Sequence, residues 1–190
     1  MPLPHDDQQI ADEIPDTLIF TEHPEVVTVG PKARRDNIVI PKDYPKLDVD
    51  RGGGITYHGP GQLVAYPIIR WTDSEQSVPG VINCLEEWVI RALTDCGIES
   101  TRDDRMQGVW IGDNKICSIG LSFLRWTSRH GFTINYDTPE GRVEMVSGCG
   151  LGADTTTSLS KLGFDLTKEQ IIQSLFSNIN IVNRELVNQD

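Results

Sequence analysis

The sequence predicts an α+β fold, on two observations. Short β-branched runs separated by turn residues dominate residues 17–69 and 108–137, whereas apolar residues at helical spacing occur in residues 81–96 and after Thr167. Strands that follow one another through short turns usually pair antiparallel. We therefore expect a mixed, mostly antiparallel sheet flanked by helices.

Length and charge narrow the classes of protein that fit. A chain of 190 residues fits one domain, so we expect a single domain over residues 1–190, with residues 1–13 flexible. A net charge of -11 argues against non-specific binding to nucleic acid or to an anionic membrane. The N-terminus has no signal-peptide character and no apolar run approaches the ~20 residues of a membrane span, so a cytoplasmic location is expected.

The first strands are predicted by composition. Thr17–His23 and Val26–Gly30 are β-branched runs separated by Pro24, the pattern of two strands joined by a short turn. Gln62–Ile69 has the composition of a buried strand. The glycine-rich stretch before it therefore links two strands.

Two helices have start and stop signals. The apolar positions of Val81–Cys96 recur at helical spacing, with Pro79 near the start and Gly97 where a C-terminal cap belongs. The last helix begins at Thr167, whose hydroxyl can cap it while Gln170 reaches back.

A meander of strands is predicted between these helices. Residues 108–126 contain two β runs around Asp113 and Asn114, which tolerate the left-handed geometry of a tight turn. Lys115 opens the second of these strands, and Phe132–Asp137 is a third strand.

The stretch RGGGITYHGPGQ, which begins at Arg51, is not a nucleotide-binding loop. A Walker loop needs a lysine where this chain has Pro60, and the dinucleotide fingerprint opens a helix, which this stretch does not. Bare glycine backbone instead lets a ligand lie against amide groups, here between Tyr57 and His58. An elongated, partly apolar ligand suits this loop, and a structural bulge between strands is the alternative.

Cys149 is the most distinctive cysteine, because Gly148 and Gly150 flank it and leave backbone N–H groups able to face a developing oxyanion. It is a candidate nucleophile, although a lone cysteine is usually structural. No cysteines have the spacing of a zinc site, so we expect no metal ion. The other cysteines fit small core positions on a helix or strand: Cys84, Cys96 and Cys117.

A nucleophilic cysteine needs a partner, because at a pKa of about 8.5 little of it is thiolate at neutral pH. The candidate partners are Lys115, His58 and His130. A charged lysine that stabilises the thiolate as an ion pair is less demanding than a neutral lysine base. The alternative is that this lysine faces solvent and that the histidines are structural.

One basic run stands out in an acidic chain. It is either a solvated loop or a face that docks an acidic partner. Its members are Lys32, Arg34, Arg35, Lys42 and Lys46.

Four motifs occur in a fixed order: RGGGITYHGPGQLVAYPI from Arg51, KICSIG from Lys115, HGFTIN from His130 and SGCG around Cys149. Together they resemble the octanoyltransferases of lipoate biosynthesis, also called lipoyl(octanoyl) transferases. The resemblance covers roughly residues 16–163, and its RGGxxTYHGPGQ motif is highly specific.

The resemblance implies transfer of an octanoyl group from octanoyl-acyl carrier protein to a specific lysine of a lipoyl domain, through a thioester on the enzyme. It implies that Cys149 is the nucleophile and that Lys115 lowers its pKa. The acyl-binding segments of the family correspond to Arg51, Gly52, Gly53, Gly54, Ile55, Thr56, Tyr57 and His58, to Ser118, Ile119 and Gly120, and to Gly131, Phe132 and Thr133.

The resemblance also implies a fold and partners. The fold is that of biotin and lipoate ligases, a mixed sheet flanked by helices. The expected acceptors are the lipoyl domains of 2-oxoacid dehydrogenase E2 subunits and the glycine cleavage H protein. No cofactor, nucleic acid or membrane is expected to take part.

Two other functions stay open. One is an ATP-dependent lipoate-protein ligase, which activates a free acid and lacks the acyl-enzyme cysteine. In those ligases a histidine and an aspartate follow the glycine motif, whereas here Gly59 follows His58. The other is a non-catalytic acyl-binding protein, against which the intact Cys149 and Lys115 argue.

Overall fold

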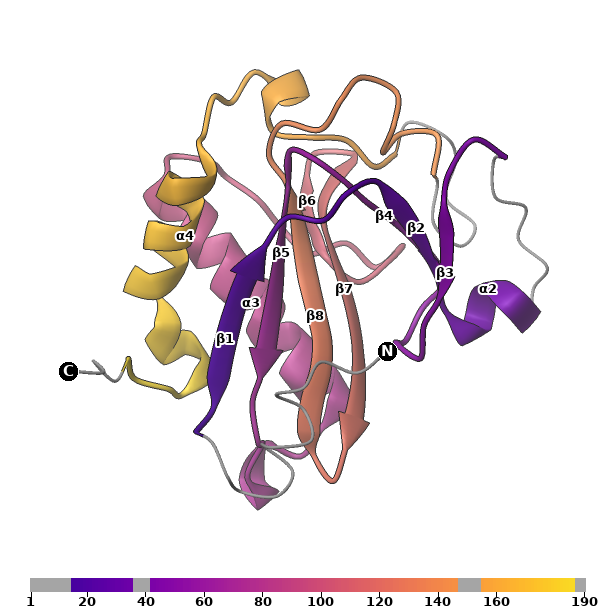
Figure 1. Ribbon diagram of the computed structural model, residues 1–190. Helices are drawn as coiled ribbons and strands as arrows, with labels where there is room; N and C mark the ends of the chain where they lie inside the picture. Colours follow the sequence, from indigo (N-terminus) through magenta and orange to yellow (C-terminus); the bar gives the residue numbers. More distant parts are fainter. Residues whose placement is uncertain (1–14, 36–41, 147–154, 187–190) are drawn as a thin grey trace.

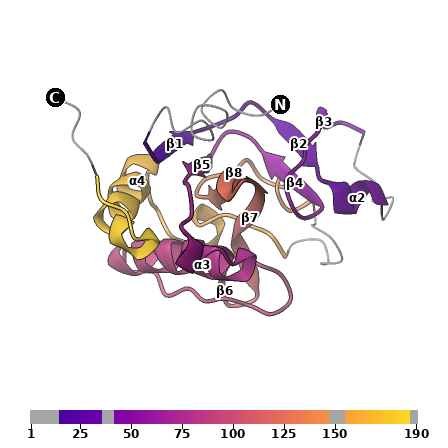
Figure 2. The same cartoon turned by 90° about the horizontal axis from the view of Figure 1, so that it is seen from below.

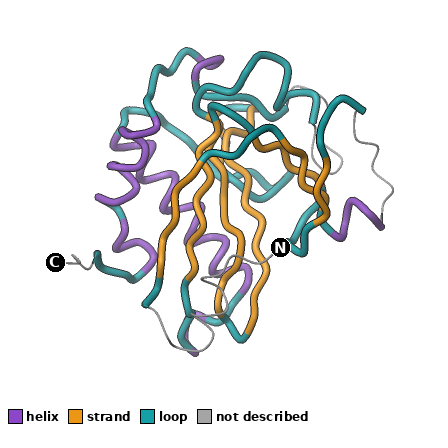
Figure 3. The backbone as a smooth tube through the Cα atoms, in the orientation of Figure 1, coloured by secondary structure: helices purple, strands orange, loops and turns teal. Residues whose placement is uncertain are grey.

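Two β-sheets organise residues 15–35, 42–146 and 155–186, the part of the chain that this computed structural model describes (Figures 1 and 3). The larger sheet has five strands in the order β1-β5-β8-β7-β6, and all neighbours in it are antiparallel. The smaller sheet has the order β3-β2-β4, with β2 parallel to β3 and antiparallel to β4. The strands are β1 (Thr17–Thr21), β2 (Val26–Val29), β3 (Lys46–Asp48), β4 (Ile55–His58), β5 (Gln62–Ile68), β6 (Val109–Ile111), β7 (Asn114–Leu124) and β8 (Thr127–Asn135).

The helices lie mainly on one side of the larger sheet. Seen from below, α3 and α4 lie on one side of it, and the smaller sheet lies on the other side (Figure 2). The α-helices are α2 (Pro31–Arg35), α3 (Val78–Asp95) and α4 (Lys168–Ser177), and the 3-10 helices are η1 (Asp73–Glu75), η2 (Ser160–Leu162) and η3 (Ile179–Val182). The α+β class is confirmed, but the strands form two sheets where we expected one.

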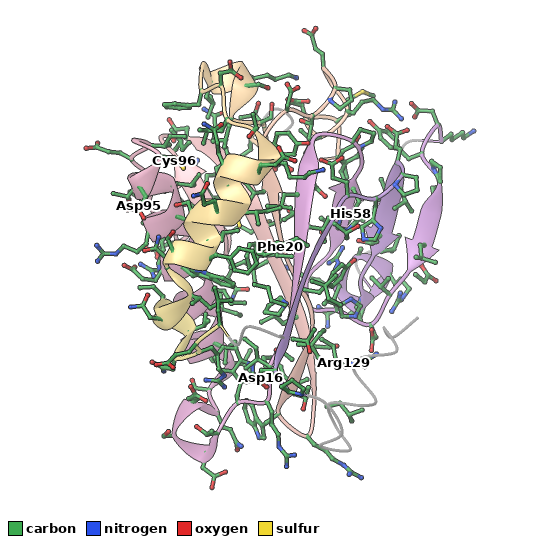
Figure 4. The ribbon with its side chains drawn as sticks, turned by 60° about the vertical axis from the view of Figure 1, so that its left-hand side comes forward. Asp16, Phe20, His58, Asp95, Cys96 and Arg129 are labelled. Carbon is green, nitrogen blue, oxygen red and sulfur yellow. The ribbon has the colours of Figure 1, made fainter. Side chains whose placement is uncertain are left out.

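The main core fills the space between the larger sheet and the helices. Trp88 of α3 is fully buried, and its indole N–H donates to the carbonyl oxygen of Leu175 in α4 at 2.8 Å, which joins the two helices. Phe132 of β8 meets the Trp88 ring edge-on at 5.7 Å. Phe20 of β1 lies beside α4, where its ring meets that of Phe176 at 5.4 Å (Figure 4).

A second core lies beneath the smaller sheet. Alternate residues of β2 and β4 point into it, together with Ala33 of α2, because successive side chains of a strand point to opposite faces. The other faces of β2 and β4 are thereby turned toward the larger sheet. The residues of this second core are Val27, Val29, Ala33, Tyr44, Ile55, Tyr57, Val143 and Val146.

Both predicted helices are confirmed. Helix α3 begins at Val78, a few residues before the predicted start, because Ser77 caps it and accepts from the N–H of Gly80. Helix α4 begins after Thr167, with the predicted capping box to Gln170.

Several predicted details of the strands are wrong. β1 and β2 are strands joined by a short turn, as predicted, but they belong to different sheets. The β6–β7 turn consists of Gly112 and Asp113, since Ile111 pairs with Asn114. β8 begins at Thr127, before the predicted start, and the glycine-rich stretch contains a strand of its own, β4. The predicted flexibility of residues 1–13 concerns a segment outside the described residues.

Candidate active site

The first cavity lies between the two sheets and has a volume of about 240 Å³. Strands of both sheets line it with alternate residues. The cavity therefore has two walls, and one face of one sheet forms each of them. We call it the inter-sheet cavity. Its lining pairs are Val26 and Thr28, Leu47 and Val49, Thr56 and His58, Val64 and Tyr66, Ser118 and Gly120, and Gly131 and Thr133, with His23, Arg51, His130 and Phe132 beside them.

Two glycines line the wall that the larger sheet contributes to this cavity. Facing sheets lie about 10 Å apart and normally fill the space between them with side chains. Here Gly120 of β7 and Gly131 of β8 are direct cross-strand partners. A Cβ atom at position 120 would lie 2.8 Å from Cδ of Arg51, and one at position 131 would overlap the backbone oxygen of Ala65. Gly120 therefore makes room for Arg51 between the sheets, whereas Gly131 lets β5 approach β8 within the larger sheet.

Arg51, the first residue of the glycine motif, is buried between the sheets. Its guanidinium donates to the backbone oxygen of Gly52 at 2.9 Å and to the backbone oxygen and hydroxyl of Thr28 at 3.0 and 2.8 Å. The loop after it is held to β7, because the N–H of Gly52 donates to Leu121 O at 2.7 Å. The glycine loop is thus attached to both sheets.

His58 is buried and neutral. The side-chain N–H of Gln62 donates to Asn135 Oδ1 at 2.8 Å, which turns Gln62 Oε1 toward His58 Nδ1, 2.9 Å away. His58 Nδ1 therefore carries the proton, and Nε2 accepts from the Thr28 hydroxyl at 3.2 Å. Burial, reinforced by the charge of Arg51, lowers the pKa of His58 to about 3. This side chain is part of the wall and no proton carrier at neutral pH.

The other two cavity histidines are also held by partners. His23 Nε2 lies 2.6 Å from the Tyr66 hydroxyl, and burial lowers the pKa of His23. His130 Nε2 lies 2.6 Å from Asp50 Oδ1, yet burial outweighs this carboxylate and the pKa of His130 is lowered as well. The three histidines therefore add little charge at neutral pH, which suits an apolar ligand beside the hydrogen-bonded Arg51.

The second cavity, of about 580 Å³, adjoins the first, and Arg51, Thr56, Ser118 and Gly120 line both. We call it the lysine cavity, after Lys115. Its other lining residues are Lys32, Gly52, Gly53, Gly54, Ile55, Tyr57, Gln62, Val78, Ile82, Asp104, Arg105, Met106, Gln107, Ile119, Leu121, Asn135, Val143, Val146 and Thr156.

Lys115 is 3% exposed, which excludes the alternative that it faces solvent. A Cβ atom at Gly108 would lie 2.6 Å from Lys115 Cε, so this glycine makes room for the lysine side chain. The Lys115 backbone N–H donates to Thr155 O at 2.8 Å, and its carbonyl accepts from the N–H of Thr157 at 3.0 Å. The lysine is thus fixed at the start of β7 by the chain that follows residue 154.

Cys149 lies outside the described residues, but the chain on both sides of residues 147–154 is described. Val146 and Thr156 line the same cavity as Lys115. The segment before Val146 is anchored by Arg142, which donates to Glu25 Oε2 at 2.7 Å and to Asp43 Oδ2 at 2.8 Å. Glu144 of the same segment accepts from two residues on the far side, Thr157 at 3.1 Å and Lys161 at 2.6 Å.

Comparison with known proteins identifies the family. The family model of the lipoyl protein ligase A/B catalytic domain matches residues 7–180. An octanoyltransferase of Syntrophobacter fumaroxidans is 37% identical over 175 residues, which cover 88% of this chain and 77% of that protein. The chain belongs to the octanoyltransferase family. It is an acyltransferase.

Solved structures confirm the predicted fold of this octanoyltransferase. A crystal structure of lipoate-protein ligase A bound with ATP matches with a TM-score of 0.71 at 13% identity, covering 97% of this chain and 83% of that one. The biotin protein ligase from Aquifex aeolicus matches with a TM-score of 0.52 at 14% identity, covering 82% of this chain and 66% of that one. At such low identity the likeness concerns the fold alone.

Every predicted acyl-binding residue of this octanoyltransferase lines one of the two cavities. Arg51, Thr56, Ser118 and Gly120 line both of them. Gly52, Gly53, Gly54, Ile55, Tyr57 and Ile119 line the lysine cavity, and His58, Gly131, Phe132 and Thr133 line the inter-sheet cavity. Of the three candidate partners of Cys149, Lys115 lines the lysine cavity, whereas His58 and His130 line the inter-sheet cavity.

Sequence reasoning missed other lining residues. The cavity faces of β2 and β5 contribute Val26, Thr28, Val64 and Tyr66. β-strand alternation indicates that the two residues of each strand share a face, but not that the two faces meet. The loop of residues 104–107 also lines the lysine cavity, and nothing in its composition indicated this.

The residues of the basic run differ in their contacts. Arg34 donates to Val29 O at 2.8 Å and lies 3.6 Å from Asp48 Oδ1, so it holds α2 to the smaller sheet. Lys32 is exposed and lines the lysine cavity.

Among the described residues, no cluster of His, Cys, Asp and Glu could hold a metal ion. Within the same ranges, no helix has the length and apolar character that crossing a membrane requires.

Proposed function

We propose that this octanoyltransferase moves an octanoyl group from octanoyl-acyl carrier protein to a specific lysine of lipoyl domains, through a thioester on Cys149. One observation carries the proposal: Val146 and Thr156, which flank the segment with Cys149, line the same cavity as the buried Lys115. The names of the relatives support the octanoyl group as the one transferred.

The first step acylates the enzyme. The Cys149 thiolate attacks the carbonyl carbon of the octanoyl thioester, a new carbon–sulfur bond forms, and the bond to the carrier thiol breaks. Backbone N–H groups of the glycine loop stabilise the oxyanion. The leaving thiolate takes a proton from the Lys115 ammonium, which leaves this lysine neutral.

The second step transfers the group to the acceptor. The neutral amine of the acceptor lysine attacks the enzyme thioester, a carbon–nitrogen bond forms, and the Cys149 thiolate leaves. Lys115 takes the proton that the amine loses, which restores the ammonium–thiolate pair. Burial of Lys115 supports this role, because an ion pair stabilises a thiolate most strongly away from water.

The described cysteines are poor alternatives to Cys149. Burial raises the pKa of Cys117 to about 12, and Cys117 is fully buried. Burial also raises the pKa of Cys84, whose thiol lies 3.1 Å from Ile181 O. Both shifts oppose formation of a thiolate. Cys96 ends helix α3, on the helix side of the larger sheet (Figure 4).

The proposed acceptors are the lipoyl domains of 2-oxoacid dehydrogenase E2 subunits and the glycine cleavage H protein. The lysine cavity is the larger of the two cavities and has a mixed polar lining, which suits the pantetheine arm of the donor in the first step and the acceptor lysine in the second. Donor and acceptor would occupy the lysine cavity one after the other, which requires a ping-pong order.

Intact-mass measurement of the acyl-enzyme tests the proposal. Octanoyl-acyl carrier protein, mixed with the wild type in the absence of ATP, is expected to add one octanoyl group that hydroxylamine removes. Cys149→Ser is expected to lose this hydroxylamine-sensitive adduct, and Cys96→Ser, the matched control at a described cysteine, to retain it. Lys115→Ala is expected to form the adduct at least a hundredfold more slowly, since the thiolate loses its charged partner.

Three outcomes would contradict the proposal. An adduct that persists in Cys149→Ser would move the nucleophile to another residue. Lipoyl-domain labelling that appears only with ATP and free octanoate would make the protein a ligase. A bound but unreacted octanoyl group would instead indicate an acyl-binding protein.

A further inference from the structure

We propose that His23 and Tyr66 close the far end of the inter-sheet cavity and thereby set the longest acyl chain that the enzyme accepts. The inference rests on the proposed octanoyl transfer. It concerns two residues outside the three acyl-binding segments that the motifs indicate.

The direction of the acyl chain follows from the way the cavities join. Ser118 and Gly120 of β7 line both cavities, so β7 is the side on which the inter-sheet cavity meets Lys115. From β7 the larger sheet continues through β8 to β5, and Tyr66 lies on the cavity face of β5. An acyl chain whose carbonyl stays in the lysine cavity therefore crosses the strands toward β5.

The distance across these strands matches an octanoyl chain. Neighbouring strands lie about 4.8 Å apart, so the span from β7 to β5 is about 10 Å. An extended chain advances about 1.25 Å per bond, given carbon–carbon bonds of about 1.5 Å, so eight carbons extend about 9 Å. The methyl end of an octanoyl group then meets the side chains on β5.

The wall at β5 is built from two side chains that hold each other. Tyr66 OH and His23 Nε2 are 2.6 Å apart, and the His23 ring also meets the His58 ring edge-on at 5.9 Å. Burial raises the pKa of Tyr66 and lowers that of His23, so both are uncharged at neutral pH. A ninth or tenth carbon must displace this bonded pair, whereas the eighth need not.

The opposite end of the cavity is built differently. There β3 contributes Leu47, which is 51% exposed, and the half-buried Val49 follows it. Neither of these aliphatic side chains can hydrogen-bond to a partner across the cavity. The two ends therefore offer a matched comparison, with Val49→Ala as the counterpart of Tyr66→Ala.

The test compares acylation of the enzyme by octanoyl-, decanoyl- and dodecanoyl-acyl carrier protein, measured by intact mass in single turnovers. The wild type is expected to react at least tenfold more slowly with the dodecanoyl than with the octanoyl donor. Tyr66→Ala is expected to raise the dodecanoyl-to-octanoyl rate ratio at least tenfold. Tyr66→Phe, which removes only the bond to His23, is expected to raise this ratio by a smaller factor, and Val49→Ala to keep it at the wild-type value.

The results that would overturn the inference differ from those that would overturn the function. A wild-type ratio in Tyr66→Ala, with octanoyl acylation still observed, contradicts the wall but leaves the octanoyl transfer standing. A ratio that rises in Val49→Ala instead places the limit at the β3 end. If Tyr66→Ala does not fold, His23→Ala opens the same wall and must raise the ratio. Absence of acylation of the wild type by every donor contradicts the proposed function itself.

Discussion

The two cavities adjoin each other but differ in the elements that line them. The inter-sheet cavity has walls of regular strands, whose alternate residues face each other across the layer between the two sheets. Loops contribute a larger share of the lysine cavity's lining, from residues 51–54, 104–107, 143 and 146, beside residues of β4 and β7. Paired strands are rigid, so the inter-sheet cavity has a fixed width. Loops are more mobile, so the lysine cavity can admit the donor and then the acceptor.

The forces that hold the two cavities differ accordingly. Backbone ladders and buried side chains fix the inter-sheet cavity, with Arg51 hydrogen-bonded to Thr28 between its walls. The loop before Cys149 depends on Arg142, whose carboxylate partner Asp43 is 58% exposed. Exposed ion pairs contribute little to stability and weaken in salt. Substitutions that change side-chain volume or bury a charge should therefore affect the inter-sheet cavity most. Substitutions that remove a charge, and added salt, should affect the lysine cavity most.

The largest effect is expected at the glycine pair of the inter-sheet cavity. Gly131→Ala places a Cβ atom against the rigid backbone oxygen of Ala65, whereas Gly120→Ala places one against the flexible side chain of Arg51. We expect Gly131→Ala to lower the free energy of unfolding by about 3 kcal/mol, in the range of overpacked buried sites. Gly120→Ala is expected to cost less than half of this. Denaturant unfolding of both variants checks the difference, and equal losses would contradict the assigned contacts.

The next effect concerns His58 in the wall of the same cavity, and it is a dependence of the free energy of unfolding on pH. The pKa of His58 is about 3 in the folded protein and about 6.5 when unfolded, so the unfolded chain binds the proton more tightly. The contribution of neutral His58 is complete above pH 6.5 and is lost as the pH falls toward 3. Within that window each pH unit costs roughly 1.4 kcal/mol of this contribution.

His58→Gln isolates this contribution, because glutamine does not titrate. The variant is expected to be less stable at pH 7, where it loses the bond to Thr28, but its stability should fall less than that of the wild type between pH 7 and pH 4. Chemical denaturation at several pH values measures both slopes. Parallel slopes would show that another group, such as His130, dominates the acid sensitivity.

Local signals predicted the elements that depend on local chemistry. The capping box of Thr167 and Gln170 and the glycine after α3 act through neighbouring backbone groups, so sequence sufficed for both helices. Strand pairing is not local. The composition of Thr17–Thr21 predicts a strand, β1. Its partner β5 lies far along the chain, so the residues near β1 do not indicate which strand it pairs with.

The same distinction explains what was predicted of the site. Glycine content and motifs indicated residues on both cavities, but alternation along a strand shows which residues share a face and not which face lies opposite. Hence Tyr66 and Thr28 could not be assigned to the cavity. Burial of Lys115 was also not predicted, because it depends on the bare backbone of Gly108, which directly precedes β6.

The smallest effect on stability is expected at the loop side, where Arg142→Ala sharpens the comparison. Arg142 pairs with Glu25 and Asp43, and its guanidinium lies 3.9 Å from the centre of the Tyr44 ring. Because these contacts are partly exposed, the melting temperature should fall by at most a few degrees. Acylation should slow by roughly tenfold, since the segment before Cys149 loses its anchor.

Salt separates this positioning role from a general loss of structure. Screening weakens the charged anchor but not the apolar walls, so raised salt should slow wild-type acylation and have less effect on Arg142→Ala. Arg142→Lys keeps the charge but cannot bond both carboxylates with a planar fork, and should lie between the two. A variant that loses stability and acylation together, with unchanged salt dependence, would place Arg142 among the residues that simply hold the fold.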